Sequence, residues 1–160
     1  MKKIFFLLLI FLVLVSFCGC VSFFEEEDQE EKDYYVGDTQ TFDGVSLKIT
    51  NVESGPYLNY NSGNSEKSQN GHWVKVSFTI EKVGNSQFKL YGSDFKLNDT
   101  YTIRDITYRH SKLESGFDVL EGNKYQFNVV FDSSYSHEEK DLRFLWSPGT
   151  FFDDTYVWIL

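Results

Sequence analysis

The chain has 160 residues, with 15 Lys and Arg against 24 Asp and Glu, so its formal net charge at pH 7 is −9. A nucleic-acid binder needs a basic face that neutralises phosphates, so this acidic balance argues against nucleic acid as a partner. Phe, Tyr and Trp make up 18% of the residues, and such large side chains favour sheet over helix.

The N-terminus has the pattern of an export signal. Two lysines precede an apolar run over residues 4–17, and residues 17–20 (Phe-Cys-Gly-Cys) resemble the cleavage box of a prokaryotic lipoprotein signal. We therefore expect a signal peptide over 1–19 and a lipid on Cys20, the first residue of the mature chain. Two alternatives stay open. Residues 4–24 carry no charge and could remain as an uncleaved membrane anchor, or the chain could be secreted without a lipid.

Residues 20–33 combine the lipidated cysteine with an acidic run that cannot bury surface, and we expect them to form an extended tether. An acidic cation-binding site is the alternative. Because the two initial lysines stay inside, the predicted location is the cell membrane, with the lipid-anchored domain facing the outside of the cytoplasmic membrane. The acidic residues of the tether are Glu25, Glu26, Glu27, Asp28, Glu30, Glu31 and Asp33.

Residues 34–160 follow the period of β-strands. Alternation is strongest over 73–83 and 125–132, where every second residue is apolar and the residues between them are mostly polar. We expect Val74, Val76, Phe78 and Ile80 to point inward from the first segment, and Tyr125, Phe127, Val129 and Phe131 from the second. Further strands are expected at 45–52, 88–91, 101–108, 141–146 and 155–160, separated by turn-forming residues. This pattern predicts an all-β, immunoglobulin-like antiparallel β-sandwich, with a small barrel as the nearest alternative.

Four segments occur together in an order that resembles a known family. They are YVGDT (35–39), WVKVSFTI (73–80), DFKL (94–97) and LEGNKYQFNVVFD (120–132). In these segments the chain resembles a family of immunoglobulin-like domains of unknown function, which occurs in bacterial and archaeal surface lipoproteins. The family is similar in fold to a secreted immunoprotective antigen. The resemblance implies a sandwich over 34–160 and an extracellular location. It implies no reaction and no catalytic residue.

The long connection over 54–71 is the best candidate for partner recognition. It holds Tyr57, Asn59, Tyr60 and Asn61 among Ser and Gly, which is the composition of antibody-type binding loops. Long loops are also where sandwiches carry function. The alternative is a mobile connection that only links two strands.

Residues able to do chemistry are few and scattered. His72, His110 and His137 each stand alone among polar neighbours, and no cysteine follows Cys20, so we predict no metal site and no cofactor. The acid pairs at 138–139 and 153–154 could serve acid/base catalysis, although adjacent acids usually point apart. Calcium is an alternative, with Asp94, Asn98, Asp99 and Asp105 as oxygen donors. Residues 98–100 also form a glycosylation sequon.

The function predicted from the sequence is that of a membrane-anchored, extracytoplasmic lipoprotein with a non-catalytic immunoglobulin-like binding module. Its membrane contact is the lipid on Cys20, and its expected partner is an envelope protein or glycan. The alternatives are an envelope hydrolase with a carboxylate-based site and a calcium-stabilised surface domain.

Overall fold

A computed structural model of the chain describes residues 33–59, 65–84, 87–107, 113–148 and 155–160. Asp33–Leu160 forms one compact unit. Among the described residues, no helix is long and apolar enough to cross a membrane. The expected signal peptide and nearly all of the expected tether lie outside the described residues.

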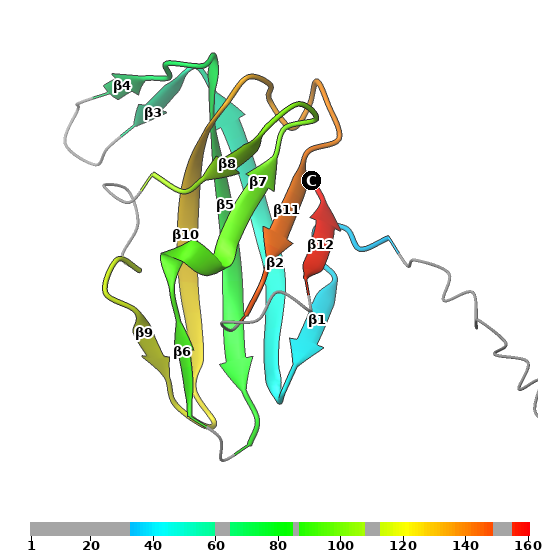
Figure 1. Ribbon diagram of the computed structural model, residues 1–160, viewed down its shortest axis with the longest axis vertical. Helices are drawn as coiled ribbons and strands as arrows, with labels where there is room; N and C mark the ends of the chain where they lie inside the picture. The colour runs from blue at the N-terminus through cyan, green and yellow to red at the C-terminus, as the bar shows by residue number, and fades with distance from the viewer. Residues whose placement is uncertain (1–32, 60–64, 85–86, 108–112, 149–154) are drawn as a thin grey trace, which may run out of the picture. The chain divides into compact units, whose positions relative to one another are not determined.

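The described residues contain twelve strands and a single turn of 3-10 helix. The strands are β1 (Thr39–Phe42), β2 (Val45–Gly55), β3 (Tyr57–Asn59), β4 (Ser65–Lys67), β5 (His72–Lys82), β6 (Phe88–Leu90), β7 (Phe95–Asn98), β8 (Ile103–Asp105), β9 (Phe117–Val119), β10 (Lys124–Ser133), β11 (Arg143–Trp146) and β12 (Tyr156–Ile159), and the 3-10 turn η1 is Gly92–Asp94. Two four-stranded sheets form the body, with strand orders β1-β2-β5-β10 and β12-β11-β7-β8. Figure 1 shows these two sheets as layers, with the β3–β4 hairpin at one end and the β6–β9 pair at the other.

The predicted alternation of β5 and β10 is confirmed. Val74, Val76, Phe78 and Ile80 of β5 are completely buried. The β10 strand pairs antiparallel with β5 along its whole length, and its inward residues become more buried toward the end of the strand. Period-two burial on one face is what a half-buried strand produces, so local sequence alone determines which face of this sheet is inside.

The core lies between the inner faces of the two sheets. Phe78 of the first sheet packs at a ring-centroid distance of 4.9 Å from Phe95 of the second, and Phe95 stacks on Phe144 at 5.5 Å. All three rings are completely buried, as are Trp146 and Trp158. The all-β antiparallel sandwich expected from the aromatic and β-branched composition is therefore the observed fold.

The expected strand at 101–108 is too long. Only Ile103–Asp105 pairs with β7 as β8. The chain then crosses to the other sheet, where the Thr107 N–H donates to the Val130 carbonyl of β10 at 2.8 Å. This crossing ends β8, because a residue that hydrogen-bonds to β10 cannot at the same time continue the pairing of β8 with β7. Five strands were not predicted from the sequence. Three of them, β1, β7 and β9, have three or four residues each, and the other two, β3 and β4, lie inside the expected loop over 54–71.

Candidate functional site

The expected recognition loop begins with a β-hairpin. Tyr57 lies opposite Lys67 and Asn59 opposite Ser65 in the β3–β4 pair. The side chain of Tyr57 is 55% exposed, which suits an aromatic contact residue. Tyr60 and Asn61, the other two predicted contact residues, lie outside the described residues.

The hairpin is held against the outer face of the first sheet by Trp73. The indole Nε1–H donates to the Glu66 carbonyl of β4 at 2.9 Å, and Trp73 is only 2% exposed. In addition, the Ser68 N–H donates a backbone hydrogen bond to the Pro56 carbonyl at 3.0 Å, which closes the base of the hairpin. Trp73 had been expected only as the start of a strand, and its position under the hairpin explains why so large a side chain stands on an outward position of β5.

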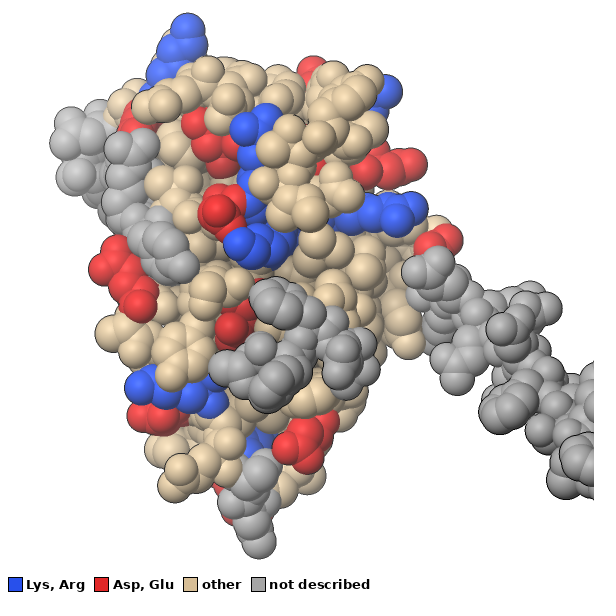
Figure 2. All heavy atoms as spheres, viewed as in Figure 1, with Lys and Arg blue, Asp and Glu red and all other residues tan. Residues whose placement is uncertain are grey.

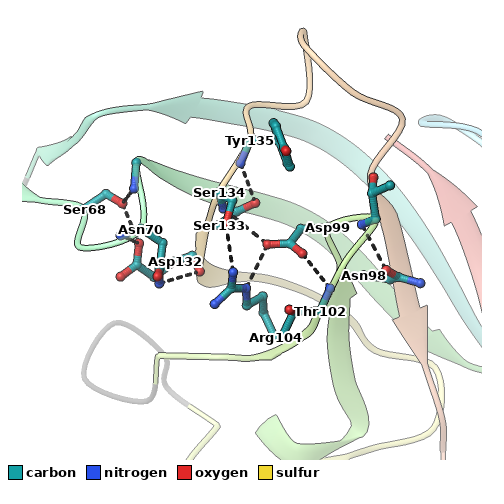
Figure 3. Close-up of polar contacts among 12 residues, drawn as sticks. Ser68, Asn70, Asn98, Asp99, Thr102, Arg104, Asp132, Ser133, Ser134 and Tyr135 are labelled. Atoms are coloured by element: carbon teal, nitrogen blue, oxygen red, sulfur yellow. Dashed lines mark hydrogen bonds and ion pairs between the residues drawn. The ribbon is translucent and has the colours of Figure 1, made fainter.

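The segment from Ser68 to Gly71 is fixed by Asp132 of β10. The Asp132 carboxylate accepts hydrogen bonds from the Ser68 hydroxyl and from the backbone N–H groups of Gln69 and Asn70, the latter two at 3.2 Å. Figure 3 shows the Ser68 hydroxyl directed at this carboxylate, and the Asn70 side-chain amide donates to the backbone carbonyl of Asp132 at 3.3 Å. Hydrogen bonds to a charged acceptor are stronger than those between neutral groups, so Asp132 makes this part of the connection an ordered support for the hairpin.

A groove of about 240 Å³ runs beside the hairpin. Its lining consists of Glu53, Ser54, Gly55, Tyr57, Leu58, Trp73 and Lys75. Lys75 Nζ lies 2.7 Å from Glu53 Oε2, which places an ion pair in the groove. The Ser54 hydroxyl lies 2.7 Å from His137 Nδ1. Aromatic surface beside a few polar groups is the usual composition of a binding site for a small polar ligand.

The expected calcium donors do not converge in the part of the chain that the structure describes, where no group of three His, Cys, Asp or Glu residues could hold a metal. Each acid has a partner of its own. Asp94 accepts from the Tyr91 N–H, Asp99 from Arg104, and Asp105 from Lys96. The separate hydrogen-bond partners of these acids give the calcium alternative no support in the described residues.

Of the other groups considered for chemistry, two histidines make contacts with the connection that follows β10 or with the end of β2. His72 Nε2 lies 3.5 Å from Glu139 Oε2, and His137 contacts Ser54. His110 and the acid pair at 153–154 lie outside the described residues. Glu138 and Glu139 are both exposed at a loop, and Glu139 accepts from the Ser136 N–H at 3.1 Å.

Sequence analysis missed the role of Asp99, which is completely buried at the β7–β8 turn. Its carboxylate accepts from Arg104 Nε at 2.8 Å, from the Thr102 N–H at 3.0 Å and from the Ser134 N–H at 3.3 Å. Burial alone would raise the pKa of Asp99, but the bonds from Arg104, Ser134 and Thr102 outweigh it, and the pKa lies below its ordinary value. Figure 3 shows Arg104 reaching Ser134 as well, so the cluster ties β8 to the end of β10.

Asp94 is the acid with the opposite shift. Burial raises its pKa to about 6, and the hydrogen bond from the Tyr91 N–H opposes that rise only in part. A folded-state pKa above the ordinary value of 3.8 means that charged Asp94 destabilises the fold, with no cost below pH 3.8 and the full cost above pH 6.

Replacing Asp94 with Asn should therefore raise the free energy of unfolding at pH 7 by about 1 kcal/mol, a value reduced for partial solvent exposure, while the amide oxygen still accepts from Tyr91. Urea unfolding at pH 7 and at pH 3.5 measures this, and the gain should vanish at the lower pH. Asp38→Asn is the matched control, because exposed Asp38 accepts from the Tyr35 N–H at the same 2.8 Å that separates Asp94 from Tyr91. A gain of equal size in both variants, or one that persists at pH 3.5, would contradict the burial argument.

No family model matches the chain, and neither does any curated protein. Solved structures do. The yjhA protein of Bacillus subtilis matches with a TM-score of 0.57 and 14% identity, over 79% of this chain and 98% of that one. The secreted protein MPT63 of Mycobacterium tuberculosis matches with a TM-score of 0.54 and 10% identity, over 81% and 97%.

A third structure is that of ycdA, a candidate lipoprotein of Bacillus subtilis, with a TM-score of 0.57 and 15% identity over 81% of this chain. The match covers 39% of the ycdA chain. At identities this low, the matches show a common fold alone. The match to MPT63 agrees with the predicted similarity in fold to a secreted protein. The chain is thus similar in fold to a secreted protein and to a candidate lipoprotein.

Proposed function

We propose that this protein is an extracytoplasmic, lipid-anchored binding module whose partner contacts lie on the β3–β4 hairpin and its groove. The observation that carries the proposal is Tyr57, an exposed aromatic side chain at the groove on a hairpin that Trp73 and Asp132 hold in place. An ordered aromatic side chain gives contact area at low entropic cost, which is how binding loops obtain affinity.

The proposed ligand class is an envelope glycan. Sugar rings present an apolar face and a rim of hydroxyl groups, and the groove offers matching groups in Tyr57 and the Glu53–Lys75 pair. The proposed role is non-catalytic, since Glu53 is the single carboxylate among the described residues that line the groove and Lys75 neutralises it. A hydrolase would need a second acid facing it at a defined separation.

The location is proposed from the N-terminal sequence, with Cys20 as the lipid attachment site. Similarity in fold to a secreted protein and to a candidate lipoprotein supports the same extracytoplasmic location. Cys20→Ser should abolish lipid attachment, so the variant should appear in the medium or accumulate as unprocessed precursor, as fractionation and mass spectrometry would show. Cys18→Ser is the control and should stay lipidated. A Cys20→Ser protein that is processed and held at the membrane like the parent would contradict the assignment.

The binding proposal is tested by Tyr57→Ala in the full-length protein, with binding measured on immobilised envelope oligosaccharides. Loss of an aromatic anchor should weaken binding by about tenfold or more, corresponding to roughly 2 kcal/mol. The free energy of unfolding should change by no more than about 0.5 kcal/mol, since the side chain is exposed.

Tyr35→Ala is the matched control for Tyr57→Ala, because Tyr35 is 53% exposed against 55% for Tyr57. Tyr35 does not line the groove, and its variant should bind like the parent. Equal binding by both variants would show that the hairpin does not form the binding site. A large loss of stability in Tyr57→Ala would show that Tyr57 supports the fold and not binding.

A further inference from the structure

A second hollow, of about 410 Å³, lies on the other sheet. Its lining residues are Asn98, Thr100, Lys140, Asp141 and Arg143. The β7–β11 register places Arg143 directly opposite Asn98, so their side chains are neighbours on the outer face of that sheet. Lys140 and Asp141 come from the connection between β10 and β11. Figure 1 shows this connection and the β7–β8 turn at the same end of the sandwich as the β3–β4 hairpin.

The charge of this hollow is opposite to that of the chain. Among the described residues, two cationic side chains and one carboxylate line it, whereas the whole chain has 24 acidic and 15 basic residues. On the face in view in Figure 2, Lys and Arg side chains lie beside Asp and Glu side chains. Lys140 and Arg143 form no ion pair with any residue that the structure describes. The hollow is therefore electrostatically suited to an anion.

The neutral side chains of the hollow present hydrogen-bonding groups in a fixed arrangement. The Thr100 N–H donates to Asn98 Oδ1 at 3.1 Å, so the amide nitrogen of Asn98 is left to face a ligand. Figure 3 shows that nitrogen directed away from the Asp99 cluster. Thr100 itself has a φ of 80°, in the left-handed region that a β-branched residue rarely adopts.

The buried neighbours of Thr100 hold it in this strained conformation. Asp99 accepts three hydrogen bonds from Arg104, Thr102 and Ser134, which fix the turn on both sides. Strain of this kind costs about 1–3 kcal/mol and persists where the surroundings over-determine it, most often at ligand-binding sites. The result is a rigid rim that presents the Thr100 hydroxyl and the Asn98 amide beside two cations.

We infer that this hollow binds the carboxylate of an acidic sugar. The planar guanidinium of Arg143 matches a carboxylate, with Lys140 adding a second positive charge. Asn98 and Thr100 are suited to ring hydroxyls, and Asp141 accepts from a hydroxyl. The carboxylate of Asp141 also repels a doubly charged phosphate more than a singly charged uronate. A uronate neutralises the net charge of the described lining, two cations against one carboxylate, whereas a zwitterionic α-amino acid leaves one cation uncompensated. This site lies apart from the hairpin groove and does not rest on it.

The test is calorimetric titration of the full-length protein in detergent with galacturonate, galactose, inorganic phosphate and alanine. Galacturonate should bind with a millimolar dissociation constant, and galactose about tenfold or more weakly, because it lacks the carboxylate. Arg143→Gln should weaken galacturonate binding about tenfold, and Lys48→Gln, which removes an exposed charge on the other sheet, should leave it within twofold. Tyr57→Ala should have no effect, so this site and the hairpin site can fail independently.

Four results would overturn the inference. They are no heat of binding at about 50 mM galacturonate, equal weakening by Arg143→Gln and Lys48→Gln, phosphate binding as tightly as galacturonate, and alanine binding more tightly than galacturonate. Each variant should first be shown to melt like the parent, which is expected because Arg143 and Lys48 are both exposed.

Discussion

Replacing Phe144 with alanine is expected to lower the free energy of unfolding by about 3–5 kcal/mol. Phe144 of β11 is completely buried, and its ring centroid lies 5.5 Å from Phe95, 6.0 Å from Trp158, 6.1 Å from Phe131 and 6.4 Å from Phe78. Phe78 and Phe131 belong to the facing sheet, so the truncation leaves a cavity between the two layers. Rigid strands on both sides prevent the cavity from closing.

Urea unfolding followed by tryptophan fluorescence measures this loss. Phe144→Leu is the control, because it keeps most of the volume and should cost less than about 1.5 kcal/mol. The midpoint should fall with little change in the slope, since the surface exposed on unfolding stays similar. A cost below about 1 kcal/mol for the alanine variant would mean that the sheets collapse onto the cavity and that the aromatic cluster is not the rigid centre of the fold.

The parts of this fold that could be predicted from sequence are those with a local signal. The strands β5 and β10 alternate over ten residues or more, and that period fixes both strand type and inward face. Loop composition led to the proposal of Tyr57 and Asn59 as contact residues, but it did not predict the hairpin that carries them. Three-residue strands such as β4 (Ser65–Lys67) show no recognisable period, so their formation depends on neighbours distant in sequence.

The supports of the candidate sites could not be predicted, because their partners are far apart along the chain. Asp132 is separated by 62 residues from Asn70. Asp99 is separated by 35 from Ser134. In the sequence, Asp99 belongs to a turn and has a calcium-type composition around it. Only the three-dimensional structure shows that Arg104 forms an ion pair with the Asp99 carboxylate. A residue expected to bind a cation therefore has a structural role instead.

Asp99→Asn is expected to lower the free energy of unfolding by about 3 kcal/mol. Removing one partner of a buried ion pair leaves the other charge uncompensated, at a cost of about 3–5 kcal/mol, and the lower end applies because Arg104 is 23% exposed. The change also replaces an ionised acceptor for the Thr102 and Ser134 N–H groups with a neutral amide that has one acceptor oxygen.

Asp105→Asn is the control for this substitution. Its carboxylate pairs with Lys96 while 73% exposed, so breaking that pair should cost at most about 1 kcal/mol. The two variants remove the same charge from neighbouring positions of the β7–β8 region. A difference between them therefore reports burial rather than net charge.

The cost of Asp99→Asn should also depend on pH. Because the folded-state pKa of Asp99 lies below its ordinary value of 3.8, its carboxylate stabilises the fold above that value and loses this effect as the pH falls through the folded-state pKa. The gap in unfolding free energy between the parent and Asp99→Asn should thus be constant from pH 5 to 7 and narrow below pH 4. Urea titrations across that range measure the gap. If it stayed constant down to pH 2.5, or matched that of Asp105→Asn at every pH, the ionised carboxylate of Asp99 would not be what holds the Thr100 turn.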